Sequence, residues 1–252
     1  MVPRMEVVYE DEQLLVCYKP AGLATQTSSI VQQDMVSQVK YYRTQKGEPP
    51  YVGVIHRLDQ PVEGLLLLAK TEEAAALLSK QLQRRQMSKH YLAVITRNAF
   101  PDHGTLEDYL IKDSQAGKAR VVTKQDPRAK LARLSYETVE DTGREKLLDI
   151  SLETGRFHQI RAQLAARTAP IFGDAKYGGT ATGRPLALCA YRLRIKSLTD
   201  GADREFVIRP RGEDFAEFTY VRDLAPVTVG APAADFAEMS VSAPGKLAVV
   251  GE

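Results

Sequence analysis

The sequence predicts an α+β fold of the mixed α/β kind, in which helices flank a central mixed, mainly antiparallel sheet. Stretches of strand length dominate the middle of the chain, at residues 88–95, 106–111, 120–123, 131–139 and 146–153, with few helical patterns between them. Strands that follow one another without crossover helices pair antiparallel, which argues against a doubly wound parallel sheet. The length of 252 residues and the hydrophobic content of 44% suffice for a full core.

The first predicted elements are a hairpin and a helix. Apolar runs at 7–9 and 14–18 are separated by Glu10-Asp11-Glu12, a pattern typical of two paired strands. Asp34 is a candidate N-cap for a helix that Gly47 and the following prolines close. We expect the apolar side of that helix to consist of Met35, Val36, Val39 and Tyr42.

A buried strand and a second helix come next. The unbroken apolar run Leu65–Ala69 predicts a strand that is covered on both faces. Thr71, followed by two glutamates, predicts the N-terminus of a helix, and Arg84-Arg85 suits the C-terminus of the same helix.

The last predicted elements are a short helix and a strand. Gly155 breaks the strand at 146–153, and a short helix is expected to start near His158. His158 and Arg161, three residues apart, then share one face. A final strand at 206–208 ends at Pro210.

Composition predicts a cytoplasmic protein without a membrane segment. The two cysteines are too few for a disulfide framework, and no apolar run approaches membrane-spanning length. Residues 223–252 are rich in Ala, Pro, Val and Ser and predict a flexible, low-complexity tail, whereas residues 1–222 are expected to form the folded domain.

Basic residues are distributed unevenly. The tail has four acidic residues and one basic residue, so residues 1–222 carry a net charge of +5 although the whole chain carries +2. Residues 80–97 contain five Lys and Arg and no acid. Such clustering fits a polyanionic partner, although basic runs are more often solvated faces of a protein.

Three separated motifs join a carboxylate, an aromatic ring and several cations. They are His56-Arg57-Leu58-Asp59, Lys89-His90-Tyr91-Leu92-Ala93 and Thr154-Gly155-Arg156-Phe157-His158-Gln159-Ile160-Arg161. Together, and in this order, they resemble the three motifs of the RluA family of pseudouridine synthases. Lys19-Pro20-Ala21-Gly22 and Gly173-Asp174-Ala175-Lys176-Tyr177-Gly178 are similar to further elements of that family.

The chain departs from the family pattern in two segments and at its start. Val62-Glu63-Gly64 stands where many members have Thr-Ser-Gly, which predicts a negative charge near the RNA path. Cys189 stands where many members have His. We expect no counterpart of the family's frequent N-terminal S4 domain, since the pattern begins almost at residue 5.

The resemblance implies a pseudouridine synthase fold with the active cleft across the middle of the sheet, Asp59 on one wall and Arg161 on the other. It assigns the catalytic carboxylate to Asp59, its charge partner to Arg161 and the aromatic contact with the flipped base to Tyr91. Burial raises a carboxyl pKa and a neighbouring arginine lowers it, so this pair would set the charge of the site.

The resemblance also implies RNA as substrate, either ribosomal RNA or tRNA, and a monomeric enzyme without metal or organic cofactor. The residues expected to contact RNA are His56, Arg57, Arg84, Arg85, Lys89, Arg156, His158 and Gln159. Support of the loops is an alternative role for His56 and Arg57, and a structural role is an alternative to phosphate contact for Arg156, His158 and Gln159. Four scattered histidines without cysteine partners do not predict a zinc site.

Two other functions stay open at this point. One is a non-catalytic RNA-binding or RNA-remodelling protein on the same fold. The other is a nucleoside or glycoside hydrolase with Asp59 as nucleophile, although that chemistry usually needs a second carboxylate.

Overall fold

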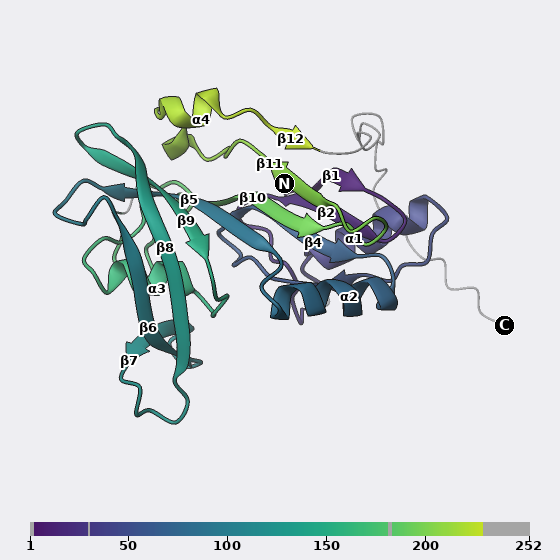
Figure 1. The fold of residues 1–252 in the computed structure, drawn as a ribbon, viewed down its shortest axis with the longest axis horizontal. Coiled ribbons are helices and arrows are strands. Elements are labelled where there is room, and N and C mark those ends of the chain that lie inside the picture. The colour runs from purple at the N-terminus through teal and green to yellow at the C-terminus, as the bar shows by residue number, and fades with distance from the viewer. Residues whose placement is uncertain (1–2, 30, 181–182, 229–252) are drawn as a thin grey trace.

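The computed structural model describes residues 3–29, 31–180 and 183–228, and within them one twelve-stranded sheet runs through the molecule (Figure 1). The strand order is β1-β2-β4-β10-β5-β9-β8-β6-β7, with β3, β11 and β12 attached beside this path. The pairings are antiparallel except for that of β4 with β10. This confirms the predicted α+β class with a mixed, mainly antiparallel sheet.

The sheet has two halves, which meet where β10 lies between β4 and β5. The N-terminal half contains β1 (Glu6–Glu10), β2 (Leu14–Lys19), β3 (Gly53–Val54), β4 (Glu63–Ala69), β10 (Leu188–Lys196), β11 (Asp203–Val207) and β12 (Val227–Thr228). The central half contains β5 (Ser88–Thr96), β6 (His103–Asp113), β7 (Lys118–Val122), β8 (Lys130–Asp141) and β9 (Glu145–Leu152). Strands β6, β7 and β8 extend away from the N-terminal half (Figure 1).

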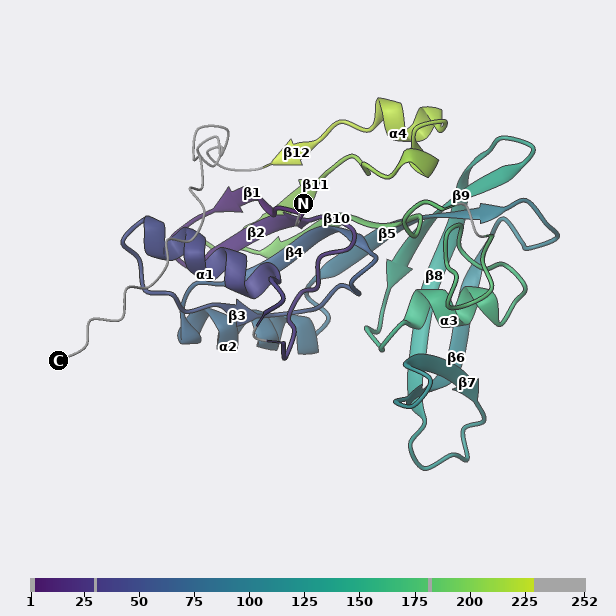
Figure 2. The ribbon, with the colours of Figure 1, turned by 180° about the vertical axis from the view of Figure 1, so that it is seen from behind.

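The helices divide between these halves. They are α1 (Met35–Gln45), α2 (Glu72–Gln83), α3 (Gln159–Ala165) and α4 (Thr219–Asp223), with a single 3₁₀ turn at Glu213–Phe215. Viewed from behind, α1 and α2 accompany the N-terminal half, and α3 lies against β6 and β8 (Figure 2). Helix α3 also packs near β7, because Ala162 joins a small cluster with Leu110, Ala119 and Ala132.

Local chemistry explains where α1 and α2 begin. Asp34 accepts a hydrogen bond from the Ser37 N–H, and the Ser37 hydroxyl accepts one from the Asp34 N–H, which is a complete capping box. Thr71 caps α2 through the Ala74 N–H, and Glu72 and Glu73 occupy the first turn. Both predicted helix starts are confirmed.

Strand β4 is buried along its whole length because helices cover both of its faces. Alternate residues point to opposite sides of a strand. Leu66 and Leu68 belong to the cluster that contains Met35 and Val39 of α1, whereas Leu65 and Leu67 pack in the cluster of α2. A strand covered on both sides loses the polar alternation of a half-exposed strand, which accounts for its unbroken apolar run.

The parallel junction between β4 and β10 is short. Only Glu63↔Cys189 and Gly64↔Ala190 are in register. Gly64 has φ +127, and a Cβ at this position would lie 2.4 Å from the Ala190 carbonyl oxygen, so only glycine permits this approach. The loop that precedes β4 ends at this junction.

Strand β10 at the centre of the sheet was not predicted. The sequence analysis noted this segment only for its departure from the family pattern at Cys189. Its residues nevertheless alternate as in a strand, since Tyr191, Leu193 and Ile195 are interleaved with Arg192 and Arg194. The predicted strand at 206–208 corresponds to β11, three residues earlier at its start. The other predicted strands and helices are present within a few residues of the expected positions.

The predicted boundary at residues 222 and 223 falls inside described structure. Asp223 ends α4, and β12 pairs with β11 through Val227 and Thr228. Arg209 Nε also donates to the Leu224 carbonyl at 2.7 Å. The rest of the predicted tail, residues 229–252, lies outside the described residues.

Candidate active site

A cleft of about 810 Å³ lies between the two halves of the sheet. One wall is the loop that precedes β4, together with the C-terminus of α2 and the start of β5. The other wall is the segment 152–161, which leads from β9 into α3. Asp59, Tyr91 and Arg161, which the three motifs supply, all line this cleft.

Asp59 lies where the two walls meet. Arg161 Nη1 lies 3.3 Å from Asp59 Oδ2, and His158 Nε2 lies 3.5 Å from the same oxygen. The Asp59 side chain is 23% exposed, so a ligand can reach it. Burial raises the pKa of Asp59, and the charges of Arg161 and Lys19 oppose that rise.

Arg161 is held in place by a second carboxylate. Its Nε and Nη2 each lie 2.8 Å from one oxygen of Asp174, which is 1% exposed, so the two groups form a bidentate pair. The Tyr177 ring lies 5.1 Å from the guanidinium carbon. Arg161 therefore satisfies Asp174 with two nitrogens and presents its third, Nη1, to Asp59.

His158 is the second group that faces Asp59. It precedes α3 with a left-handed backbone, φ 50, and its Nδ1 lies 2.9 Å from the Tyr177 hydroxyl. That hydroxyl accepts from the Ala119 N–H at 2.6 Å and lies 3.4 Å from the Ala119 carbonyl oxygen, so the nearer His158 Nδ1 is the better acceptor for its proton. The His158 proton is then on Nε2, which faces Asp59. Burial, together with the charge of Arg161, lowers the pKa of His158 to about 3, so the ring is neutral.

A buried lysine supports the loop that carries Asp59. Lys19 is fully buried, and its ammonium donates to the carbonyl oxygens of Pro20 at 2.9 Å, Leu23 at 2.6 Å and Gln60 at 3.1 Å. Burial lowers the pKa of Lys19 to about 7, although the charges of Asp59 and Glu63 raise it. The lysine thus joins the turn after β2 to the residue that follows Asp59.

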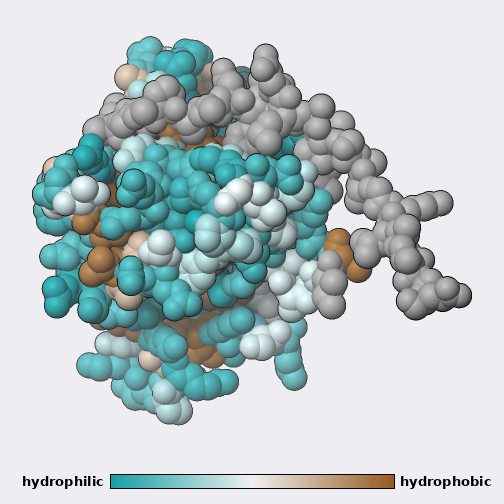
Figure 3. All heavy atoms as spheres, turned by 90° about the vertical axis from the view of Figure 1, so that its right-hand side faces the viewer, coloured by the Kyte–Doolittle hydropathy of each residue, from teal (hydrophilic) through white to brown (hydrophobic). Residues whose placement is uncertain are grey.

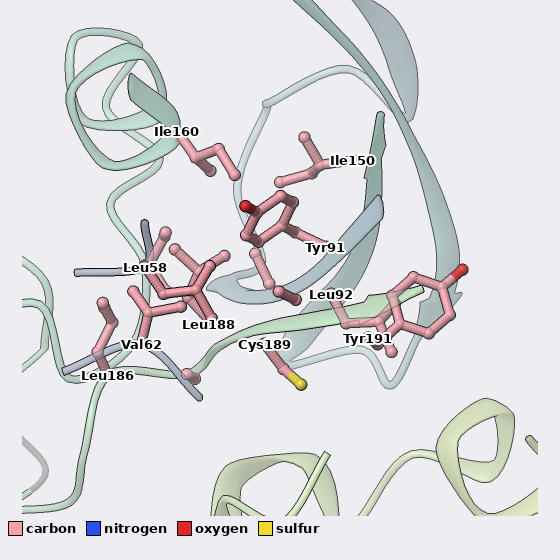
Figure 4. Packing of buried hydrophobic residues seen from close by; sticks show 14 of the residues in the cluster. Leu58, Val62, Tyr91, Leu92, Ile150, Ile160, Leu186, Leu188, Cys189 and Tyr191 are labelled. Carbon is pink, nitrogen blue, oxygen red and sulfur yellow. The ribbon is translucent and has the colours of Figure 1, made fainter. Parts of the chain in front are cut away.

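Tyr91 lies in the apolar floor of the cleft. Figure 4 shows its ring among Leu58, Ile150, Ile160 and Leu188. Its hydroxyl makes no hydrogen bond to another described residue, and burial, with a further contribution from the charge of Asp59, raises its pKa. An uncommitted hydroxyl beside a carboxylate and an apolar surface could contact a flat, polar-edged ligand such as a nucleobase.

The residues predicted to contact RNA fall into three groups. Arg57, Arg85 and Arg156 are exposed and line the cleft. His56 and Lys89 line its inner wall, and His158 faces Asp59 as described above. Arg84 is exposed at the C-cap of α2 and does not line the cleft.

Gln159 is 3% exposed, and its amide is occupied within the fold. Its oxygen accepts from the Thr154 hydroxyl at 2.7 Å and from the Arg156 N–H at 3.0 Å, and its nitrogen donates to the Arg133 carbonyl at 3.1 Å. A direct contact between this amide and RNA, as the sequence analysis expected, would require breaking these bonds. Its position indicates support of the turn before α3.

The predicted charge of Glu63 near an RNA path is wrong. Glu63 is 3% exposed in β4, and its carboxylate accepts from the Gly212 N–H at 2.9 Å and from the Arg211 N–H at 3.1 Å. The Tyr18 hydroxyl also donates to it. Glu63 therefore anchors the segment after β11, because backbone donors and a buried phenol satisfy its charge.

Sequence reasoning did not assign site roles to Lys19, Asp174 and Tyr177. All three belong to motifs that were noted, namely Lys19-Pro20-Ala21-Gly22 and the segment Gly173–Gly178. Distance along the chain gives no sign of such contacts, since even Arg161 and Asp59, which are in contact, are 102 residues apart. Among the described residues, no three potential metal-ligating side chains converge.

A carboxylate held between an arginine and a neutral histidine, above an apolar floor with one free tyrosine hydroxyl, defines a candidate active site on an α+β scaffold. The family model described as RNA pseudouridylate synthase matches residues 13–166. The chain therefore belongs to the RNA pseudouridylate synthase family, and the resemblance to its RluA members is confirmed.

Curated relatives agree with this membership. The chain is 34% identical over 200 residues to ribosomal large subunit pseudouridine synthase D of Nitrosomonas europaea, covering 77% of this chain and 56% of that protein. It is 31% identical over 194 residues to tRNA pseudouridine synthase C of Yersinia pestis, covering 73% and 74% respectively. The chain spans little more than half the length of several of these relatives.

A solved structure has the same fold. The structure titled Human RNA Pseudouridylate Synthase Domain Containing 1 superimposes with a TM-score of 0.68 at 22% identity, and the match covers 92% of this chain and 94% of that one. No helix of the described residues has the length and apolar character needed to cross a membrane.

Proposed function

We propose that this chain is an RNA pseudouridine synthase, an isomerase that converts specific uridines in structured RNA to pseudouridine. The N1–C1′ bond of the uridine breaks, a C5–C1′ bond forms, a proton leaves C5 and N1 takes up a proton. Atoms and electrons balance within the nucleotide, so the reaction needs no metal or organic cofactor. The observation that carries the proposal is the Asp59 carboxylate, bonded to Arg161 and faced by His158, all within the residues 13–166 that the family model matches.

Each residue has a distinct part in this reaction. Asp59 is the reacting carboxylate, and Arg161 keeps it ionised in a partly buried site. Tyr91 stacks on the base once the uridine has left its helix, and its free hydroxyl can take part at C5. His56, Arg57, Arg85, Lys89 and Arg156 contact the RNA backbone along the cleft.

The proposed substrate is ribosomal RNA or tRNA, the two classes named among the relatives. We further propose that the protein acts as a monomer in the cytoplasm. Pseudouridine mapping of total RNA from a deletion strain and its parent would identify the target position.

The first prediction concerns Asp59→Asn. This variant keeps the shape of the side chain but loses the charge and the basic oxygen. Loss of one hydrogen bond costs about 0.5–1.5 kcal/mol, or roughly tenfold in rate. An obligatory carboxylate predicts a loss of many orders of magnitude with RNA binding retained. Single-turnover conversion and a binding curve on the mapped RNA measure both.

Asp141→Asn is a suitable control, because Asp141 forms an exposed ion pair with Arg97 at 3.0 Å away from the cleft. It should convert RNA like the parent. If Asp59→Asn keeps a tenth or more of the parent rate, Asp59 is not the reacting carboxylate.

A hydrolase that uses Asp59 as nucleophile is less well supported. Such an enzyme usually needs a second carboxyl group as acid. Asp174 is buried and engaged by two nitrogens of Arg161, and Glu153 pairs with Arg133 at 3.1 Å. Release of free uracil from the RNA would favour the hydrolase.

A further inference from the structure

Two nitrogen donors on the inner wall of the cleft lack an acceptor among the described residues. His56 Nε2 accepts a hydrogen bond from the Leu67 N–H at 3.2 Å. The proton of the neutral ring is therefore on Nδ1, which is buried and has no partner in the described part of the chain. A buried donor without an acceptor is rare in native proteins and calls for an explanation.

Lys89 is the second donor. It precedes Tyr91 by two residues on β5, so both side chains leave the same face of the strand about 7 Å apart. In residues 3–29, 31–180 and 183–228, no hydrogen bond or ion pair joins the Lys89 ammonium to another side chain. The ammonium lies 3.5 Å from the position that a Cβ of Gly155 would occupy, so the glycine leaves space beside it.

The two donors are electrostatic neighbours. Burial lowers the pKa of Lys89. Burial also lowers the pKa of His56 to about 3, and the charge of Lys89 adds to that effect. Both groups are partly removed from water, and the charge of Lys89 acts on His56. A cation and an N–H donor in this situation favour a shared anionic acceptor.

The carboxylates of the cleft do not supply that acceptor. Asp59 is engaged by Arg161, and Glu153 lies 3.1 Å from Arg133 and 3.9 Å from Arg85. An external anion can supply the acceptor, and the exposed arginines at the cleft edge would attract one.

We propose that Lys89 and the Nδ1–H of His56 form a phosphate-binding subsite, which holds one backbone phosphate of the RNA beside the uridine at Asp59. This inference rests on the proposed function for the identity of the ligand. The subsite fixes the sugar-phosphate chain on one side of Tyr91, so that the unstacked base lies over the tyrosine ring with its C1′ toward Asp59. Both residues are positioning residues, since they touch the substrate away from the reacting bonds.

A titration with inorganic phosphate tests the subsite without any enzyme assay. Nitrogen-15 spectra of the imidazole groups report the Nδ1 of His56, with sodium chloride at equal ionic strength as the reference. The parent should show a saturable change at His56 with phosphate. Lys89→Met, which keeps the side-chain length but removes the charge, should weaken phosphate binding at least tenfold. Lys40→Met, at an exposed position of α1, should bind like the parent.

Two results of this titration would contradict the proposed subsite. One is an equal response of His56 to phosphate and chloride in the parent. The other is an unchanged phosphate affinity in Lys89→Met.

A second experiment tests whether the subsite binds a phosphate of the RNA substrate. In the mapped substrate, the phosphates 5′ and 3′ of the target uridine are replaced one at a time by neutral methylphosphonates. With the parent protein, one of the two replacements should raise KM about as much as Lys89→Met does, with little change in kcat. With the Lys89→Met protein, the same replacement should have no further effect on KM. Additive effects at both positions would contradict the proposal. If no RNA is modified at all, the proposed function fails while the phosphate titration still decides the subsite.

Discussion

At the scale of single residues, the site separates two carboxylates that share one arginine. Asp174 takes the bidentate side of Arg161 with both contacts at 2.8 Å, and Asp59 receives the remaining nitrogen at 3.3 Å. Asp174 is buried and Asp59 is partly exposed, so only Asp59 can meet a ligand. The pair with Asp174 thus fixes the position of Arg161, and Arg161 in turn sets the charge of Asp59.

The second prediction concerns Asp174→Asn. An amide cannot accept both guanidinium nitrogens, so a buried cation loses its main partner. Removing one partner of a buried ion pair costs about 3–5 kcal/mol of unfolding free energy. Denaturant unfolding should show a loss of this size, and single-turnover conversion should slow because Arg161 can leave Asp59.

A matched control is Asp203→Asn, which breaks an exposed pair with Arg194 at 2.8 Å. Exposed pairs contribute little to stability, so its unfolding curve should overlay that of the parent. A stable Asp174→Asn protein with parental turnover would show that Arg161 keeps its position without Asp174.

At the scale of elements, a few interactions join segments that are far apart in sequence. Glu63 on β4 holds the backbone of Arg211 and Gly212, and Arg211 extends to Glu6 of β1 with its Nη2 at 2.7 Å. The guanidinium of Arg211 also lies 4.0 Å from the centre of the Tyr18 ring. The first two strands and the segment after β11 are therefore fastened at one point.

The third prediction concerns Glu63→Gln. The amide keeps one acceptor oxygen but presents an NH₂ group to backbone donors, so at least one N–H of residues 211 and 212 loses its partner. An unsatisfied buried donor costs about 1–3 kcal/mol. Thermal unfolding should move to lower temperature, and hydrogen exchange should accelerate in residues 209–224. Turnover at saturating RNA should be retained, because Glu63 does not line the cleft.

Glu213→Gln is the comparison for this variant, since Glu213 pairs with Arg184 at the surface. Its exchange pattern should match the parent. Unchanged exchange at 209–224 in Glu63→Gln would mean that the segment is held by its apolar contacts alone.

At the scale of the whole molecule, two halves of one sheet meet at a parallel pairing of two residue pairs, and the cleft opens there. The end of the molecule that carries α1 and α2 is largely hydrophilic, with apolar atoms in small patches (Figure 3).

The fourth prediction is the pH dependence of stability. Burial lowers the pKa values of His56 and His158 from 6.5 to about 3 in the folded state. Between these values the unfolded chain binds protons that the folded chain does not, so the free energy of unfolding falls as pH falls below 6.5. Denaturant unfolding at pH 7.5 and pH 5 should show this loss, before ordinary carboxylates begin to titrate.

The same shifts predict the shape of the rate profile. Because both rings are neutral, the conversion rate should not change near pH 6.5 through histidine titration. The fall in rate at acid pH should follow protonation of Asp59. A rate limb near 6.5 that disappears in His158→Gln would contradict the neutral state of His158.

The sequence by itself determined most of the elements and the choice of candidate site residues. Apolar runs and capping residues give β2, β4, α1 and α2, because strand burial and helix ends leave patterns within a few neighbouring residues. The motifs predicted Asp59, Tyr91 and Arg161 as the candidate catalytic residues, since each motif is contiguous in the chain.

Only the tertiary structure decided how those groups are held. The placement of β10 between β4 and β5, the burial of Glu63 and Gln159, and the contacts of Lys19, Asp174 and Tyr177 all join residues distant in sequence. Whether a polar side chain meets solvent, a backbone donor or another charge depends on which segments fold beside it. Local patterns carry no information on that packing, so a glutamate that sequence places near RNA can instead be a buried anchor.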